Sequence, residues 1–296
     1  MSEQNKIIVG VVGLGSMGLG MAATLASKGF ETLGFDLSAE RLELSAKVGV
    51  TAIKDLSDLF RKSDFLVFSL PTARDVENVV NDYGHLLGAE RQNRVIIVDT
   101  STSEPDVSRQ LAGKLDKMGH GFLDAPVSGG PAGAASGALT MMIGGTDADL
   151  ALARPVIEAL SAKALHVGPS GAGNVAKLVN NMLAAAHMIT TGEGLKIALA
   201  AGISPESALR VINAASGKSM ISEVHFPTWV MNDRFDSGFS MGLMRKDVRL
   251  AQALAEKNNV ENPLTAMVAK LWACSEHLKD TDDFTRMGAY QSDTAK

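Results

Sequence analysis

Apolar positions divide the chain into two regions with different periodicity. Through residue 168, short apolar runs rich in β-branched residues alternate with helical patterns, as buried parallel strands alternate with crossover helices. The runs lie at residues 7–12, 31–35, 65–70, 95–98, 139–143 and 164–167. Beyond Ala201 only helical patterns remain, at 207–215, 219–231, 241–258 and 263–278. The chain is therefore predicted to form an α/β domain over 1–168 and an all-helical domain over 169–296.

A long helix from Gly173 to Ala201 is predicted to open the second domain. Its apolar residues follow the i, i+3, i+4, i+7 spacing of a single helix face. They are Val175, Leu178, Val179, Met182, Leu183, Ala186 and Ile189. Asn174, Lys177 and Asn181 fall on the opposite stripe. At 1.5 Å per residue the helix extends roughly 40 Å, which is enough to pass from one domain into another.

Lys177 is the strongest candidate in the chain for a group that does chemistry. A lone helical lysine is most often a solvated side chain, but Lys177 is the only Asp, Glu, Lys or Arg between Lys163 and Glu193. Helix surfaces that face water usually carry charges of both signs. The segment is therefore expected to be buried on most sides, where an ammonium group is retained for a partner or a reaction. Asn181 lies one turn further along and can reach the same small molecule.

A glycine pattern follows the first predicted strand. Gly13, Gly15 and Gly18 form G-x-G-x-x-G, which alone can be a purely structural turn. Here a strand precedes the glycines, a helical pattern follows, and a second strand ends at Asp36. This context predicts a dinucleotide-binding unit with the pyrophosphate at the helix N-terminus. Asp36 is suited to ribose hydroxyls and repels a 2′-phosphate, which favours NAD over NADP. The predicted contacts are Gly13, Leu14, Gly15, Ser16, Met17, Gly18 and Asp36.

The ends of two later strands add candidates for the cofactor site. Ligands of open α/β sheets bind at the carboxyl ends of the strands. Leu70, Pro71 and Thr102 are therefore expected on the nicotinamide side of the cofactor. Thr102 equally fits the N-cap region of the next helix, because Pro105 follows it and proline favours the first turn. Both interpretations of Thr102 stand at this point.

Two further stretches can bind an anion. Ser128, Gly129 and Gly130 form a turn whose backbone N–H groups are unobstructed, which suits a carboxylate, although a plain loop explains the same residues. Lys246 can reach a bound anion, although Lys246 and Asp247 also fit a solvated charge pair.

Composition argues against several classes of partner. A net charge of −5 gives no reason to expect nucleic acid or an anionic membrane, and no apolar run has the length of a bilayer span. The single Cys274 excludes an intrachain disulfide and is expected to be a small core residue. No Cys/His cluster has metal-ligand spacing, so no metal site is predicted. The N-terminal residues lack the apolar region of a signal peptide, which favours the reducing cytoplasm.

Four motifs, taken in order, resemble those of the β-hydroxyacid dehydrogenase family over nearly the whole chain. They are Val12 to Gly18, Asp124 to Gly130, Gly171 to Asn181, and Lys246-Asp247. The resemblance implies a Rossmann domain joined by a long helix to a helical domain, with the active site in the cleft between them. It also implies assembly as a homodimer or homotetramer.

The resemblance assigns roles to the candidate residues. Lys177 looks like the catalytic lysine of the family. Substrate-binding groups are implied at Ser128, Gly129, Gly130, Asn181 and Lys246. Leu70 and Thr102 match positions beside the nicotinamide half of the cofactor, and Lys246 is also expected to contact the cofactor.

The resemblance implies a reversible hydride transfer between NAD and a small 3-hydroxy acid or its semialdehyde. Lys177 is expected to act as general acid and base, since burial can bring the pKa of a lysine towards neutrality. A 3-hydroxyisobutyrate-type substrate is favoured. Reduction of tartronate semialdehyde or sulfolactaldehyde, and oxidation of L-threonate, are alternatives. An NAD-binding sensor without catalysis is the alternative from a different class.

Overall fold

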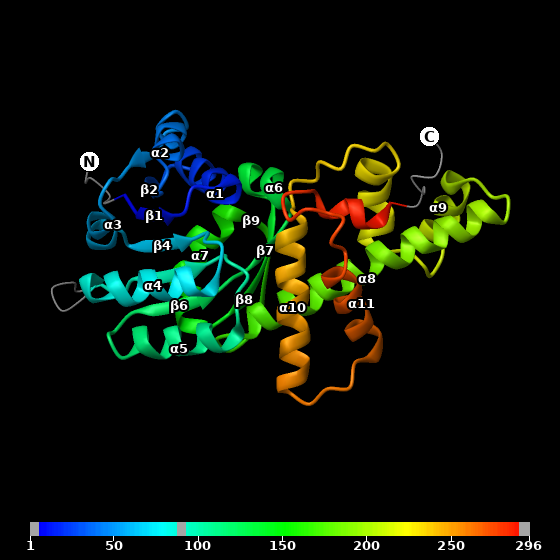
Figure 1. Cartoon of the computed structure of the whole chain (residues 1–296). Coiled ribbons are helices and arrows are strands. Elements are labelled where there is room, and N and C mark those ends of the chain that lie inside the picture. Colours follow the sequence, from blue (N-terminus) through cyan, green and yellow to red (C-terminus); the bar gives the residue numbers. More distant parts are fainter. Residues whose placement is uncertain (1–5, 88–92, 290–296) are drawn as a thin grey trace. The chain divides into compact units, whose positions relative to one another are not determined.

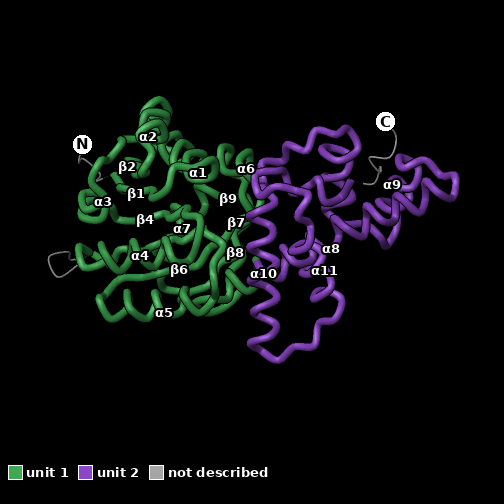
Figure 2. Tube along the Cα trace, viewed as in Figure 1, with its two compact units in different colours: residues 1–177 green, residues 178–296 purple. Residues whose placement is uncertain are grey.

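The computed structural model describes residues 6–87 and 93–289. It divides into two compact units, residues 1–177 and 178–296 (Figure 2). The division falls at Lys177, inside the long helix α8 (Ala172–Ala200). Among the described residues, no helix has both the length and the hydropathy that crossing a bilayer requires.

The first unit is built on one sheet (Figure 1). Six of its strands match the predicted apolar runs, whereas β3, β6 and β7 were not predicted. The strands are β1 (Ile8–Val12), β2 (Glu31–Phe35), β3 (Thr51–Ala52), β4 (Phe65–Phe68), β5 (Ile96–Asp99), β6 (Gly121–Asp124), β7 (Val127–Ser128), β8 (Leu139–Gly144) and β9 (Ser161–Gly168). Their order is β3-β2-β1-β4-β5-β6-β8-β7, and β9 pairs with β8. Pairing is parallel from β3 to β6, whereas β8 runs antiparallel to β6 and β7.

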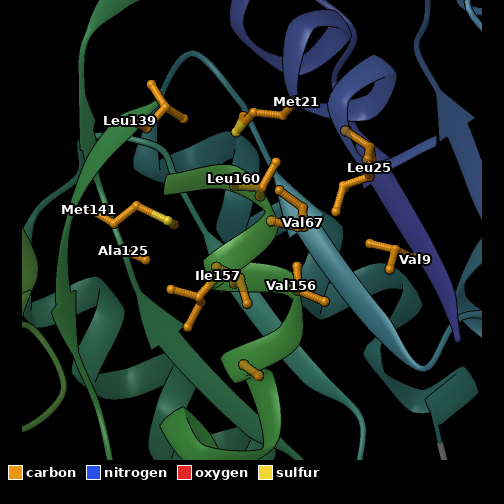
Figure 3. Close-up of a cluster of buried hydrophobic side chains, with 14 of the residues drawn as sticks. Val9, Met21, Leu25, Val67, Ala125, Leu139, Met141, Val156, Ile157 and Leu160 are labelled. Carbon is orange, nitrogen blue, oxygen red and sulfur yellow. The ribbon is translucent and has the colours of Figure 1, made fainter. Parts of the chain in front are cut away.

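Helices cover both faces of this sheet, so the predicted Rossmann-type α/β fold is confirmed. On one face, α1 (Ser16–Ser27) and α7 (Asp147–Leu160) pack on Val9, Val67 and Val98 (Figure 3). On the other face, α3 (Leu56–Lys62), α4 (Ala73–Tyr83) and α5 (Pro105–Asp116) pack on Leu66 and Ile97. Successive residues of a strand point to opposite faces, so strands buried on both sides read as unbroken apolar runs. The remaining short elements are α2 (Ala39–Ala46), η1 (Gly84–Leu87) and α6 (Gly130–Ser136).

Every helix or strand element in the described part of the second unit is a helix. The elements that follow α8 are α9 (Pro205–Ala214), η2 (Ile221–Val230), α10 (Met241–Lys257), α11 (Pro263–Ala273) and η3 (Phe284–Gly288). The η2 segment is a π-helix. It contains Pro227, which lacks an N–H group and crowds the carbonyl four residues before it in an α-helix. Helix α11 ends at Ala273 instead of extending to Leu278, because the guanidinium of Arg245 holds the carbonyls of Ser275 and Leu278 in a turn.

The orientation of α8 corrects one prediction. Val179 and Leu183, placed on the apolar face by their spacing, are 52% and 49% exposed. Asn174, Lys177 and Asn181 are 0%, 7% and 5% exposed, so the polar stripe is buried together with one edge of the apolar face. A buried polar side chain is tolerated where it has hydrogen-bond partners. Periodicity cannot reveal such partners. The expectation that α8 is buried around Lys177 is confirmed, whereas the expectation that Val179 and Leu183 are buried is wrong.

Cys274 also differs from its prediction. It is exposed and occupies the C-cap of α11, where the chain leaves the helix. The expectation of a small core residue is wrong because the helix ends there, five residues before its predicted end.

Candidate functional site

The glycine turn between β1 and α1 is shaped for close approach by a ligand. Gly13 has φ of +88°, and a side chain on Gly18 would overlap the carbonyl oxygen of Gly13. A side chain on Gly15, in contrast, would meet nothing within 4 Å. Helix α1 begins here without a side-chain cap and without an acidic residue in its first turn. Its N-terminal N–H groups are therefore suited to the pyrophosphate of a dinucleotide.

Asp36, at the end of β2, lies against this turn. One carboxylate oxygen accepts a hydrogen bond from the backbone N–H of Leu14 at 2.7 Å, and the other accepts from Ser38 at 2.8 Å. The backbone thus fixes the carboxylate beside the glycines and leaves further lone pairs on both oxygens for hydroxyl donors. Among the other predicted contacts, Ser16 is exposed, whereas the side chain of Leu14 is fully buried, so Leu14 offers only its backbone.

The turns after β4 and β5 are joined by a hydrogen bond. The backbone N–H of Leu70 donates to the hydroxyl of Ser101 at 2.9 Å. Thr102 is half-buried next to it. The N-cap of α5 is Glu104, two residues beyond Thr102, so Thr102 belongs to the strand-end turn and does not cap α5.

The start of α8 is anchored by Asp124, the last residue of β6. Its carboxylate accepts hydrogen bonds from the backbone N–H groups of Gly171 at 2.6 Å and Asn174 at 2.9 Å. Burial raises the pKa of the Asp124 carboxyl above its ordinary value, and these hydrogen bonds only partly offset that effect. A side chain on Gly173 would overlap the carbonyl oxygens of Asp124 and Met142, so glycine is required where α8 crosses the sheet edge.

Asn174 connects the first turn of α8 to the turn after β5. Its side-chain oxygen accepts the backbone N–H of Ser103 at 2.9 Å, and its amide nitrogen donates to the hydroxyl of Ser108 at 3.1 Å. All three residues are at most 1% exposed. Lys177, 7% exposed, follows three residues later on the same helix.

Ser128, Gly129 and Gly130 lie where β7 meets α6. Gly129 and Gly130 have φ of +126° and +61°, a conformation that favours glycine. Ser128 pairs with Thr140 of β8, so the sheet holds the first residue of this turn.

In the second unit, Asp247 links two of the predicted site residues. Its Oδ2 accepts a hydrogen bond from the side-chain amide of Asn181 at 2.7 Å. Its Oδ1 lies 3.3 Å from the Lys246 ammonium, within ion-pair range but without hydrogen-bond geometry. Asp247 is 2% exposed and the Lys246 side chain 17% exposed. The alternative of a solvated surface pair is therefore wrong.

Two family models match this chain in succession. Residues 8–168 match the NAD binding domain of 6-phosphogluconate dehydrogenase, and residues 171–290 match the NAD-binding domain of NADP-dependent 3-hydroxyisobutyrate dehydrogenase. The chain belongs to the 3-hydroxyisobutyrate dehydrogenase-like β-hydroxyacid dehydrogenase family.

Relatives of this dehydrogenase act on different substrates. It is 34% identical to the 2-(hydroxymethyl)glutarate dehydrogenase of Eubacterium barkeri, over 91% of this chain and 89% of that one. It is also 34% identical to the NAD-dependent L-serine dehydrogenase of Pseudomonas aeruginosa, over 89% of this chain and 90% of the relative. The solved structure of Mycobacterium tuberculosis 3-hydroxyisobutyrate dehydrogenase with L-serine has a TM-score of 0.88 and 30% identity, and the match covers 96% and 98% of the two chains.

Sequence reasoning did not identify the side chains that hold this dehydrogenase's site segments in place. The sequence indicates Asp124 only as a motif member and Asn174 only as part of the polar stripe and a motif, and it does not single out Ser101 or Ser103. The unbroken polar run from Asp99 to Ser103 at the end of a predicted buried strand is the signal that was available, because polar residues that become buried there need partners in the fold.

Proposed function

We propose that this dehydrogenase transfers hydride between NAD and the primary alcohol of a small 3-hydroxy carboxylate. The single observation that carries the proposal is the burial of Lys177. This lysine lies on α8, and the first turn of α8 is anchored at the carboxyl ends of strands that follow the glycine turn in the chain. Ligands of such sheets bind at these strand ends.

The substrate class follows from what the named substrates of the relatives share. 3-Hydroxyisobutyrate, L-serine and 2-(hydroxymethyl)glutarate each carry a CH₂OH group on the carbon next to a carboxylate. They differ in the second substituent of that carbon, which is methyl, ammonium or carboxyethyl. We favour 3-hydroxyisobutyrate or a close analogue. Tartronate semialdehyde, sulfolactaldehyde and L-threonate are the further candidates.

Each residue has a distinct task in this proposal. When bound, the nicotinamide cofactor supplies the hydride acceptor or donor. Lys177 takes the hydroxyl proton in the oxidative direction and returns it in the reductive direction. Asn181, held by Asp247, orients the reacting oxygen. Lys246 and the N–H groups of the Ser128, Gly129 and Gly130 turn bind the carboxylate.

The choice of NAD rests on Asp36. A carboxylate fixed by two backbone N–H groups accepts from ribose hydroxyls and repels a 2′-phosphate. Gly13, Gly15, Gly18 and the N-terminus of α1 would hold the pyrophosphate. Leu70, Pro71 and Thr102 would contact the nicotinamide half.

We also propose that the protein assembles as a homodimer or homotetramer. One side of α8 carries exposed apolar side chains: Val179, Leu183 and Ile197 are 52%, 49% and 70% exposed. Such a surface supports packing of this side of α8 against a second copy of the chain. A cytoplasmic location remains a prediction from the sequence.

A screen of short 3-hydroxy acids for NADH formation tests the proposed function. In the same assay, Lys177→Ala should lower kcat by about 10²–10⁴-fold and leave NAD affinity nearly unchanged. Lys163→Ala is the matched control, because it removes an exposed lysine of the same unit. A Lys177→Ala enzyme with nearly full activity would exclude Lys177 as the acid and base.

Two further outcomes separate the alternatives. Tight NAD binding without turnover of any acid would favour the non-catalytic sensor. Equal use of NADP in parallel assays would contradict the role given to Asp36.

A further inference from the structure

Hydrogen bonds, most of them buried, connect the carboxyl ends of three neighbouring strands with the first turn of α8. Leu70, after β4, donates to Ser101, and Ser103, after β5, donates to Asn174. Asp124, at the end of β6, accepts from Gly171 and from the backbone of Asn174. All of these residues belong to the first unit. Asn174 is where α8 meets the turn that contains Thr102.

Capping of the helix does not explain the Asn174 side chain. Asp124 already accepts the N–H groups of Gly171 and Asn174 at the start of α8, and the Asn174 carboxamide bonds to two other segments. Its oxygen accepts the Ser103 N–H, and its nitrogen donates to Ser108 of α5. Burying a carboxamide is costly unless its polar atoms are paired. The side chain is thus committed to joining α8 to the turn after β5.

We propose that Asn174 is a positioning residue that sets Lys177 against the turn of residues 101–103, which the proposed function places beside the nicotinamide. Lys177 lies three residues after Asn174, about 4.5 Å along the helix axis. A movement of about 1 Å between reacting groups can cost roughly a hundredfold in rate. Small rotations of the first turn of α8 therefore matter to the chemistry.

The experiment compares Asn174→Ala with Asn81→Ala in the full chain. Asn81 is an exposed asparagine of the same unit that makes a surface hydrogen bond with Lys114. For Asn174→Ala we expect kcat per folded molecule to fall about 10–100-fold, while the dissociation constant of NADH rises less than about threefold. We expect Asn81→Ala to behave like the wild type.

A second readout does not depend on turnover. NADH fluorescence reports the surroundings of the nicotinamide, so NADH bound to Asn174→Ala should emit more like free NADH than NADH bound to the wild type. Wild-type emission together with wild-type kcat and a lowered melting temperature would make Asn174 a purely structural residue and overturn the proposal. An inactive wild type would contradict the proposed function alone, because the emission difference would still test Asn174.

Ser108→Ala provides a milder variant in case Asn174→Ala does not fold. It frees only the amide end of Asn174 and retains the bond to Ser103. We expect a two- to fivefold lower kcat and a smaller shift of NADH emission in the same direction. No change in either quantity would overturn the proposal.

Discussion

Two buried aspartates contact α8, one in each unit, and they are held in opposite ways. Asp124 accepts hydrogen bonds from two backbone N–H groups of the helix start. Asp247 accepts one from the side chain of Asn181, and its other oxygen has only the Lys246 ammonium, without hydrogen-bond geometry. Both are at most 2% exposed. Burial alone therefore does not distinguish a carboxylate that anchors the backbone from one that orients a side chain. The hydrogen-bond partners of the carboxylate do distinguish the two.

The largest expected effect separates the two aspartates by stability. Asp124→Ala leaves the N–H groups of Gly171 and Asn174 without acceptors, and each unsatisfied buried group costs roughly 1–3 kcal/mol. We expect the free energy of unfolding to fall by about 3 kcal/mol in urea titrations followed by circular dichroism. Asp116→Ala, which removes an aspartate from an exposed ion pair with Arg94, should change it by less than about 1 kcal/mol. Equal losses from both substitutions would contradict the anchoring role.

Asp247→Ala should have a smaller effect on stability. It removes one hydrogen bond and also a buried carboxylate oxygen without a hydrogen-bond donor, so we expect a loss of about 1 kcal/mol or less. The kcat should nevertheless fall about tenfold or more, because Asn181 loses the group that orients it. Asp247→Asn retains an acceptor oxygen and should recover part of kcat. A stability loss as large as that of Asp124→Ala would remove the contrast between the two sites.

The smallest expected effects are pH dependences of opposite sign in the two units. Burial against Trp229 and Phe284 lowers the pKa of His225 below 6.5, although the Met220 carbonyl and Asp283 oppose this shift. As pH falls through 6.5 the unfolded chain takes up a proton before the folded one does, so stability is lost on acidification, by at most about 1.4 kcal/mol per pH unit. Tryptophan fluorescence should report this in urea titrations, since both tryptophans, Trp229 and Trp272, lie in the second unit.

His225→Phe should remove most of that dependence, and His277→Phe, at an exposed position, should leave it in place.

For Asp124 the sign of the pH dependence is reversed. Its pKa is raised above 3.8, so the folded protein binds the proton more tightly, and this contribution to stability is lost as pH rises from 3.8 through the raised value. The dependence should be absent in Asp124→Asn. The same sign of slope for both groups would contradict the assigned causes.

The fold was predictable to a large extent because its signals are local. Unbroken apolar runs identified most of the buried strands, and helix α10, Met241–Lys257, ends within one residue of the predicted range 241–258. The contact between the glycine turn and Asp36 joins Leu14 to a residue only 22 positions further along the chain, within a single βαβ unit. The π-helix and the early end of α11 were not predicted, because they depend on Pro227 and on the long-range contacts of Arg245.

By itself, the sequence determined the alternation of strands and helices, the place of the dinucleotide turn and the isolation of Lys177 from other charges. Only the tertiary structure decided that Val179 and Leu183 are exposed and what Asn174 and Asn181 bind. The partners of these residues, Ser103 and Asp247, are 71 and 66 positions away. Periodicity reports how neighbours along the chain share a face, whereas a hydrogen bond between distant segments exists only once the order of the strands and the packing of the helices bring its donor and acceptor together.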